Sequence, residues 1–462
     1  MSDQCPPWSG ASGDQQRSET SLLEMVIRGE GIPDAQMRGV FLGVSVQLTV
    51  GRTMTMKSIL NRQMVAGVIL LAGLSAGHCQ LVTNRTLTHA NNAFAIDFYK
   101  KAGTEPGNPV FSPYSISAAF AMTYPGAAGE TARQMQKVMY WTNAAPKVAS
   151  DFAELDQLLL AAQKEGAVQI SIANALWPQK GYRFRQQYLD LLTQTFKTSL
   201  HEADFEKQPE VERLRVNEWV EKQTRDRIKG LMPVGSINNQ TRLVLANAIY
   251  FKAKWGSPFK TAATHPGPFY LASGDSVNTP LMAIIDDFRF AVMPTFKLLE
   301  MPYQRGKLSM LVILPNATNG LSQLNKELSA EKLDQWIKAL RTTRVSVFFP
   351  KFTVSFQLKL NDALSALGMP DAFDRNRADF AGMTAEQPPL FMSSAMHKAF
   401  VEVTEEGTEA AAATGLVMTK TSAGPRVEIP IFRADHPFLY LIRHNPSGTI
   451  LFFGRLNVPA KA

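Results

Sequence analysis

Cysteine is scarce in this sequence, which has two in 462 residues, Cys5 and Cys79. No cysteine follows position 79, so the longer part of the chain can form no disulfide, bind no zinc through thiolates and use no cysteine nucleophile. Its stability must come from an apolar core, which a chain of this length can supply.

Recognisable enzyme motifs are also missing after position 79. This part has no G-x-S-x-G, P-loop, G-x-G-x-x-G or H-E-x-x-H pattern. Its histidines show no spacing typical of metal ligands, and the sequence alone assembles no catalytic triad from them. They are His89, His201, His265, His397, His436 and His444. We therefore expect no enzyme activity, no catalytic residue, no metal and no cofactor.

The apolar run from Met64 to Leu74 is too short to span a bilayer. It follows two basic residues and precedes three small ones, an order typical of a secretory signal peptide. We expect a signal peptide at 56–79, cleaved after Gly77 or after Cys79. The protein should then be secreted and extracellular, with no membrane partner.

A signal peptide should start at the N-terminus, whereas this one starts well inside the chain. Met54 and Met56 stand just before it, and the residues upstream are polar and without a sustained period. The simplest hypothesis is that translation starts at one of these methionines. Residues 1–55 would then be a non-native or disordered extension, and 80–462 a single domain.

Charge of either sign is not concentrated along the chain. The first 79 residues hold six basic and six acidic side chains, which leaves 42 and 34 of the total 48 and 40 for the rest. This mild excess is unlike the clustered charge of nucleic-acid-binding proteins, so we expect no nucleic-acid partner. It is either an ordinary basic surface or a weak binding surface for an anionic polysaccharide.

Three Asn-x-Ser/Thr triplets follow the signal segment, at Asn84, Asn239 and Asn316. A single triplet is common by chance, but together with a signal peptide they predict a glycoprotein.

Helical and strand-like patterns alternate in 80–462 without an internal repeat. Strands are predicted at 168–177, 241–251, 307–314, 345–355 and 389–404, and helices at 151–164 and 211–233. Ser112-Pro113 is typical of a helix start, because serine caps the first turn and proline suits its first position. The mixture predicts an α+β fold in one domain.

The segment EEGTEAAAAT at 405–414 combines conflicting local signals. Its alanines favour a helix, yet it directly follows a strand-like alternation and precedes a polar loop. A mobile loop that enters a sheet as a new strand would need a glycine for the turn and small, uncharged inward side chains. Insertion of about fourteen residues, at about 1 kcal/mol per backbone hydrogen bond, would release on the order of 10 kcal/mol.

Five ordered sequence blocks resemble the serpins, a family of serine-protease inhibitors. The blocks are NPVFSPYSISAAFAM (108–122), TRLVLANAIYFKAKWGSPF (241–259), AMHKAFVEV (395–403), EEGTEAAAAT (405–414) and FRADHPFLYLI (432–442). The resemblance covers roughly Ala90 to Pro459 and looks most like secreted arthropod members. It implies a single-domain serpin fold with three β-sheets, about nine helices and an exposed reactive-centre loop at about 405–430.

The resemblance also implies a mechanism. A target serine protease would cleave the loop and form an acyl-enzyme ester. The freed loop would insert into the main sheet and drag the protease along before water releases it. We expect the tract from Gly407 to stay outside the fold until then, and the inhibitor to be a metastable monomer.

Single residues acquire roles from the same resemblance. The hinge residues are Glu405, Gly407, Thr408, Ala410, Ala411, Ala412, Ala413 and Thr414. The polar cluster beneath the sheet opening is Ser112, Ser115, Asn247 and His397, and Trp255 lies at the point of loop insertion. The alternative for each is a structural role, with Ser112 as a helix cap, His397 as a satisfied core histidine and Trp255 as a core aromatic.

The family's usual spacing from Glu405 places the reactive bond between Thr421 and Ser422. A threonine there suits an elastase-like protease with a small or medium apolar pocket. Lys420 is the alternative for a trypsin-like protease, and Arg426 is a third candidate.

Polyanion activation of the heparin type is not supported, because the segment 151–164 is acidic where heparin-activated serpins are basic. Lys338, Arg341 and Arg344 offer a weak polyanion site elsewhere, or a solvated basic face.

Two other functions remain open: a non-inhibitory serpin acting as a carrier or chaperone, and a secreted hydrolase. Non-inhibitory members often carry proline, charged or bulky hinge residues. Between Thr408 and Thr414 this chain has none except Glu409, which is usual in inhibitors.

Overall fold

The computed structural model describes residues 86–102, 107–164, 168–198, 200–385, 389–408 and 428–459. Every described residue belongs to one compact unit, Leu74–Ala462. Some sequence predictions fall outside the described residues: the extension (1–55), the signal peptide (56–79), Asn84, Ala410, Ala411, Ala412, Ala413, Thr414, Lys420, Thr421, Ser422 and Arg426.

Helices and strands are mixed along the chain. The described strands are β1 (Val110–Phe111), β2 (Val168–Pro178), β3 (Leu243–Lys254), β4 (His265–Tyr270), β5 (Ser276–Val292), β6 (Phe296–Pro302), β7 (Leu308–Pro315), β8 (Arg341–Pro350), β9 (Phe352–Lys359), β10 (Ser394–Val403), β11 (Gly407–Thr408), β12 (Ile431–Arg433), β13 (Phe438–His444) and β14 (Ile450–Leu456). The described helices are residues 86–102, α4 (Pro113–Thr123), α5 (Gly129–Val138), α6 (Ala145–Lys164), α7 (Gln186–Gln194), α8 (Pro209–Gln223), α9 (Leu321–Glu327), α10 (Ala330–Ala339) and α11 (Leu360–Leu367).

The described strands form a nine-stranded and a five-stranded hydrogen-bonded sheet, and the nine-stranded one divides at β5 into two halves, which gives the three sheets of the expected fold. One half contains β4, β5, β8 and β12, and the other runs from the end of β5 through β6, β7, β13 and β14 to β1. The long strand β5 joins them, because Leu281 to Phe290 pair with β8 while Arg289 to Val292 pair with β6. The third sheet, here called the main sheet, has the order β2-β3-β11-β10-β9.

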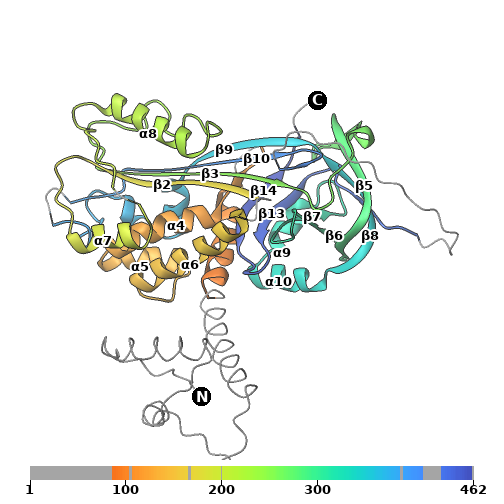
Figure 1. Ribbon diagram of the computed structural model, residues 1–462, viewed down its shortest axis with the longest axis horizontal. Helices are drawn as coiled ribbons and strands as arrows, with labels where there is room; N and C mark the ends of the chain where they lie inside the picture. Colours follow the sequence, from red (N-terminus) through yellow and green to blue (C-terminus); the bar gives the residue numbers. More distant parts are fainter. Residues whose placement is uncertain are drawn as a thin grey trace, which may run out of the picture. The chain divides into compact units, whose positions relative to one another are not determined.

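Helices cover both faces of the main sheet. Figure 1 shows α4, α5 and α6 on one side of it and α8 on the other. Along β3 the side chains alternate between the two, with Leu245 and Ile249 in the core on the α4 side and Val244 and Ala248 in the core beneath α8. Burial on both faces explains why this strand is almost continuously apolar rather than alternating.

Helix α4 begins as its sequence predicts. Ser112 is the N-cap, its Oγ accepts a hydrogen bond from the Ser115 backbone N–H at 3.0 Å, and Pro113 occupies the first turn. This cap fixes the end of α4 that lies beneath the main sheet, where the candidate site begins.

Two predicted elements end differently in the structure. The helix predicted at 211–233 stops at Gln223, because Arg225 and Asp226 adopt left-handed φ values of 53° and 60°, which an α-helix cannot contain. The strand predicted at 345–355 is two strands, β8 and β9, which break at Lys351.

Candidate functional site

The predicted hinge begins inside the main sheet. Gly407 and Thr408 form the short strand β11 between β3 and β10, antiparallel to both, and Thr408 pairs with Ala253 on one side and Val403 on the other. The expectation that the whole tract from Gly407 lies outside the fold at rest is therefore wrong for its first two residues. The backbone hydrogen bonds of two sheet partners favour this position.

The boundary between β3 and β10 keeps one register throughout. Residues 244–250 of β3 pair directly and in parallel with residues 394–400 of β10. Asn247 lies opposite His397, so paired residues differ by 150 in number. The same offset relates Ala253 and Val403, which face each other across Thr408. We call this boundary the seam. β11 therefore separates β3 from β10 at one end of the seam, and the two strands keep the same register relative to each other there.

Close backbone approach explains the glycine at position 407. A Cβ atom there would lie 2.1 Å from the carbonyl oxygen of Ala253, so any other residue would force the strands apart. A tight turn leads into β11, since the backbone N–H of Thr404 donates to the carbonyl of Gly407 at 2.8 Å.

Thr408 is fully buried, and its hydroxyl shares a hydrogen bond of 2.7 Å with the hydroxyl of Tyr303. The ring of Tyr303 in turn stacks on Trp255, with ring centroids 4.7 Å apart. Trp255 donates from Nε1 to the carbonyl of Thr404 at 3.0 Å and from its backbone N–H to the carbonyl of Glu406 at 2.8 Å. Trp255 thus lies where the hinge leaves β10, and its role in loop insertion stays a prediction.

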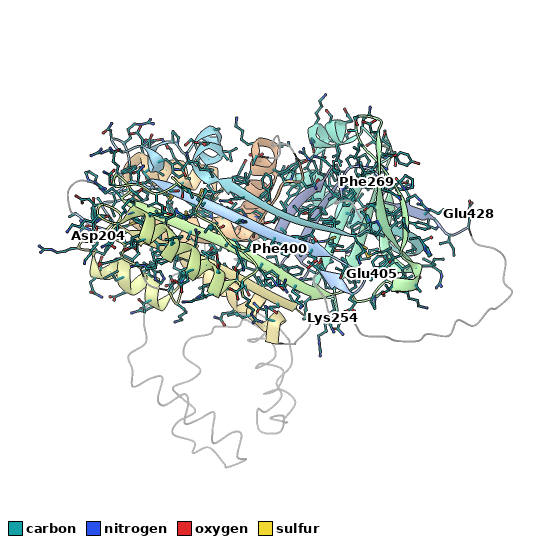
Figure 2. The ribbon with its side chains drawn as sticks, turned by 90° about the horizontal axis from the view of Figure 1, so that it is seen from above. Asp204, Lys254, Phe269, Phe400, Glu405 and Glu428 are labelled. Atoms are coloured by element: carbon teal, nitrogen blue, oxygen red, sulfur yellow. The ribbon has the colours of Figure 1, made fainter. Side chains whose placement is uncertain are left out.

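Glu405 anchors the segment that precedes β11. Its carboxylate pairs with Lys351 at 2.9 Å and accepts a hydrogen bond from the Thr264 hydroxyl at 2.9 Å. Burial opposes ionisation, but these hydrogen bonds outweigh it, so the pKa of Glu405 lies below its ordinary value. Figure 2 shows Glu405 and Lys254 at the same end of the main sheet.

The predicted polar cluster comes together beneath the seam. Ser112, Ser115, Asn247 and His397 are all fully buried. The Nδ2 group of Asn247 donates to the carbonyl and to the hydroxyl of Ser115, both at 2.9 Å, which ties β3 to α4. The resemblance implies this proximity, and its part in sheet opening stays a prediction.

His397 is held neutral in this cluster. Its Nε2 atom accepts the backbone N–H of Ser112 at 3.0 Å, so the proton sits on Nδ1, which donates to Oδ1 of Asn247. Burial lowers the pKa of His397 to about 3. Ser112 is therefore both a helix cap and a partner of His397, as the two readings of the sequence allow.

Several residues of the site were missed by sequence reasoning. Asn174 of β2 joins the cluster, where its Oδ1 accepts from Ser115 and Asn247. Tyr303, Lys351 and Thr264 contact the hinge. No local pattern singles them out, because each comes from an element far from the hinge in sequence.

The remaining predicted surface residues are exposed. Asn239 and Asn316 lie in turns after α8 and β7, accessible to solvent. Lys338, Arg341 and Arg344 are exposed near the junction of α10 and β8. Among the described residues, no helix is long and apolar enough to cross a membrane, and no cluster of His, Cys, Asp and Glu could hold a metal ion.

Residues 89–459 match the sequence model of the family described as "Serpin (serine protease inhibitor)". The chain belongs to the serpin family. Family membership confirms the resemblance, the α+β serpin fold with three sheets and about nine helices, and the expectation that this chain is not an enzyme.

Named relatives support the same assignment. The serpin chain is 38% identical to human "Serpin B3" over 392 residues, which cover 81% of this chain and 100% of the relative. It is also 38% identical to human "Leukocyte elastase inhibitor" over 384 residues, 81% of this chain and 99% of that one.

Solved structures agree in fold. Native protease nexin-1 with heparin is 30% identical with a TM-score of 0.72, covering 81% of this chain and 100% of that one. Human thyroxine-binding globulin complexed with thyroxine is 28% identical with a TM-score of 0.75, covering 82% of this chain and 100% of that one.

Proposed function

We propose that this serpin is a secreted inhibitor that traps a serine protease as an acyl-enzyme while its cleaved loop inserts along the seam. The observation that carries the proposal is β11. The first two residues of the tract already occupy the seam, antiparallel to both borders. Insertion then continues a strand that has already started.

The register of β11 defines where each further residue would go. Continuing it places Ala410 between Phe251 and Val401, and Ala412 between Ile249 and Ala399. These border side chains lie in the core on the α4 side, where an inserted side chain must be small. The alanines of the tract meet this requirement.

The same register brings Thr414 to the buried cluster, between Asn247 and His397. Its hydroxyl could replace one of the hydrogen bonds that the separating strands lose, so a polar residue suits this one position. This match between spacing and environment is the second support for insertion along the seam.

The target is proposed from the loop sequence. Cleavage between Thr421 and Ser422 suits an elastase-like protease, and cleavage after Lys420, or after Arg426, suits a trypsin-like one. A relative named leukocyte elastase inhibitor favours the first.

The decisive experiment incubates the purified protein with a panel of serine proteases. We expect a covalent complex with one protease that survives SDS, and mass analysis of the released C-terminal peptide identifies the bond. Cleavage without any complex, across elastase-like and trypsin-like enzymes, would instead support the carrier or chaperone alternative. Turnover of a substrate would support a hydrolase.

Secretion and glycosylation are part of the proposal. Translation is expected to start at Met54 or Met56, with signal cleavage after Gly77 or Cys79. N-terminal sequencing and deglycosylation of protein secreted from cells test this. A peptide from residues 1–53 in the secreted protein would overturn the proposed translation start. The absence of glycan on all three acceptors would overturn the proposed glycosylation.

Polyanion binding is proposed as weak and unrelated to activation. Protease nexin-1, a relative of known structure, is described in complex with heparin. In this chain Lys338, Arg341 and Arg344 are exposed, and we expect heparin to bind there weakly, without accelerating inhibition. We also expect the protein to be a monomer.

A further inference from the structure

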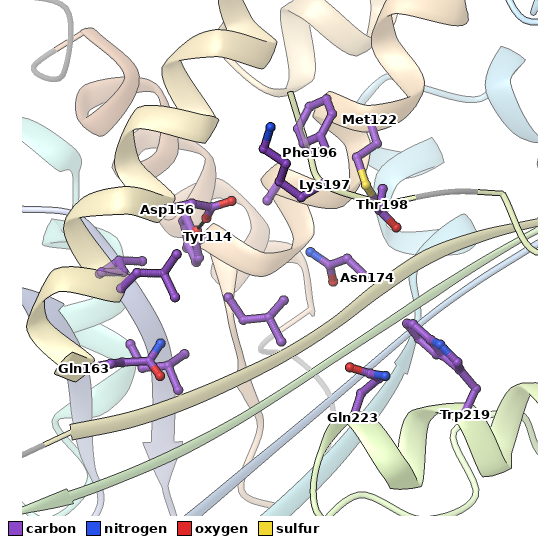
Figure 3. Close-up of a pocket in the computed structure, with 15 residues that line it drawn as sticks. Tyr114, Met122, Asp156, Gln163, Asn174, Phe196, Lys197, Thr198, Trp219 and Gln223 are labelled. Atoms are coloured by element: carbon purple, nitrogen blue, oxygen red, sulfur yellow. Dashed lines mark hydrogen bonds between the residues drawn. The ribbon is translucent and has the colours of Figure 1, made fainter. Parts of the chain in front are cut away.

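A cavity of about 410 Å³ lies at the edge of the main sheet, between α4, α6 and β2. Figure 3 shows its lining side chains converging from these elements, with Trp219 and Gln223 of α8 across the edge strand. β2 is the outermost strand of the sheet on this side, so the cavity borders the flank of the sheet that faces away from the seam.

A carboxyl group stands in the wall of this cavity. Asp156 of α6 accepts a hydrogen bond from the hydroxyl of Tyr114, and Figure 3 shows the two side chains pointing toward each other. Within the described residues no lysine, arginine or histidine is paired with Asp156. Burial raises the pKa of this carboxyl to about 7. The wall therefore holds a partly buried acid without a cationic partner.

The basic side chain among the described lining residues, Lys197, does not fill that role. Lys197 is exposed, and its Nζ atom donates to the carbonyl of Gln194 at 2.7 Å. Apolar side chains make up much of the remaining wall, among them Leu159, Ile172 and Phe196. The chemistry that complements this wall is a single positive charge on an apolar body.

The cavity also touches the polar cluster beneath the seam. Asn174 lines the cavity and accepts hydrogen bonds from Ser115 and Asn247. Opening the seam by one strand must move β2 and β3 relative to α4. A molecule that contacts both Asn174 on β2 and Tyr114 on α4 binds the closed arrangement better and so opposes that movement.

We propose that this cavity, here called the α6 cavity, binds an amphipathic amine whose ammonium group pairs with Asp156, and that occupancy slows loop insertion. The first half concerns binding alone. The second half rests on the proposed function, because it assumes that the seam opens during inhibition.

The test uses three probes with one apolar body, phenylbutylamine, phenylbutanol and phenylbutyrate, titrated into the whole protein by calorimetry at about pH 8. At that pH the Asp156 carboxyl is mainly ionised and the amine still protonated. We expect the amine to bind about tenfold more tightly than the alcohol, and the carboxylate most weakly. Asp156→Asn should bring the amine to the affinity of the alcohol and leave the alcohol unchanged.

A matched control lies on the same helix. Glu154→Gln removes a carboxylate of α6 that does not line the cavity, and it should leave all three affinities unchanged. Equal loss of amine binding in both variants would overturn the site, as would tightest binding of the carboxylate or the alcohol. Thermal melting of each variant without probe confirms that it is folded.

Protease trapping tests the regulatory half separately. With the amine bound, the number of inhibitor molecules consumed per trapped protease should rise at least about twofold, and Asp156→Asn should abolish the rise. Amine binding without this rise would overturn the regulation but leave the site. Amine binding by a protein that traps no protease would overturn the proposed function alone.

Discussion

Thr408 is the first side chain of the loop tract to be buried, so its chemistry decides whether further residues can follow. We predict that Thr408→Arg converts the inhibitor into a substrate, because a charged side chain at this fully buried position costs several kcal/mol. The number of inhibitor molecules consumed per trapped protease should rise at least about tenfold.

The control for this prediction is Glu409→Arg, which introduces the same guanidinium group on the opposite face of the inserted strand. The register of β11 places this position between Lys252 and Glu402, which are both partly exposed. This variant should leave trapping near its original level. Unchanged trapping by Thr408→Arg would refute the hinge assignment.

His397 gives the protein a specific pH dependence. Its folded pKa is lowered to about 3, so the unfolded chain binds a proton between about pH 6.5 and 3 that the folded chain does not. Stability is unaffected above this window and falls as the pH drops through it. From about pH 7 to 5 the protein should lose about 2 kcal/mol more than His397→Gln, measured by urea unfolding.

His444 does not disturb this comparison. Burial also lowers its pKa, to about 4, but it is present in both proteins and its contribution cancels. Parallel pH profiles of the two proteins would show that His397 is not the titrating group.

At the scale of elements, β11 depends on the anchor at Glu405. We predict that Glu405→Lys destabilises the protein by about 1–2 kcal/mol, since it breaks the pair with Lys351 and sets two cations against each other. This loss of stability is smaller than the loss expected for a fully buried ion pair, because the Lys351 side chain is 37% exposed. Urea unfolding measures the loss.

The reversed pair distinguishes charge from packing. Glu405→Lys combined with Lys351→Glu should recover most of the loss. The same exchange at the exposed pair of Glu218 and Lys222 should change stability little. No recovery in the reversed pair would mean that packing, rather than charge, holds the anchor.

At the scale of the whole molecule, the uncleaved fold should be metastable. We predict that cleavage within 415–422 raises the melting temperature by on the order of 10–20 °C, as about a dozen residues gain sheet hydrogen bonds. Scanning calorimetry of intact and cleaved protein measures this. The Thr408→Arg variant, cleaved in the same way, should show little of this rise in melting temperature. An equal rise would show that the stabilisation does not come from insertion along the seam.

Sequence patterns were sufficient for much of this fold. The buried strand at 241–251, the cap at Ser112 and the α+β class follow from apolar periodicity and local hydrogen bonding. The end of α8 was not predicted, because left-handed residues after Thr224 stop the helix before the glycine and proline that suggested its end.

The candidate site was predictable only in part. One continuous segment gives the hinge and the alternation that places Thr408, Ala410, Ala412 and Thr414 on one face of the inserted strand. The polar cluster came from the family resemblance. Asn174, Tyr303 and Lys351 reach the site from separate strands, and only the assembled sheets bring them together. The insertion of Gly407 and Thr408 at rest reflects a balance of hydrogen bonding and burial that no periodicity encodes.

The shared register on both sides of β11 constrains how the sheet can move. Its two flanks need only separate sideways by one strand spacing, about 4.8 Å, with no sliding along the strands. Ser171 on β2 and Ser355 on β9 lie in one row across the sheet, through Tyr250 and Phe400. Because no native cysteine follows position 79, spin labels on cysteines introduced at these two serines could report the displacement directly.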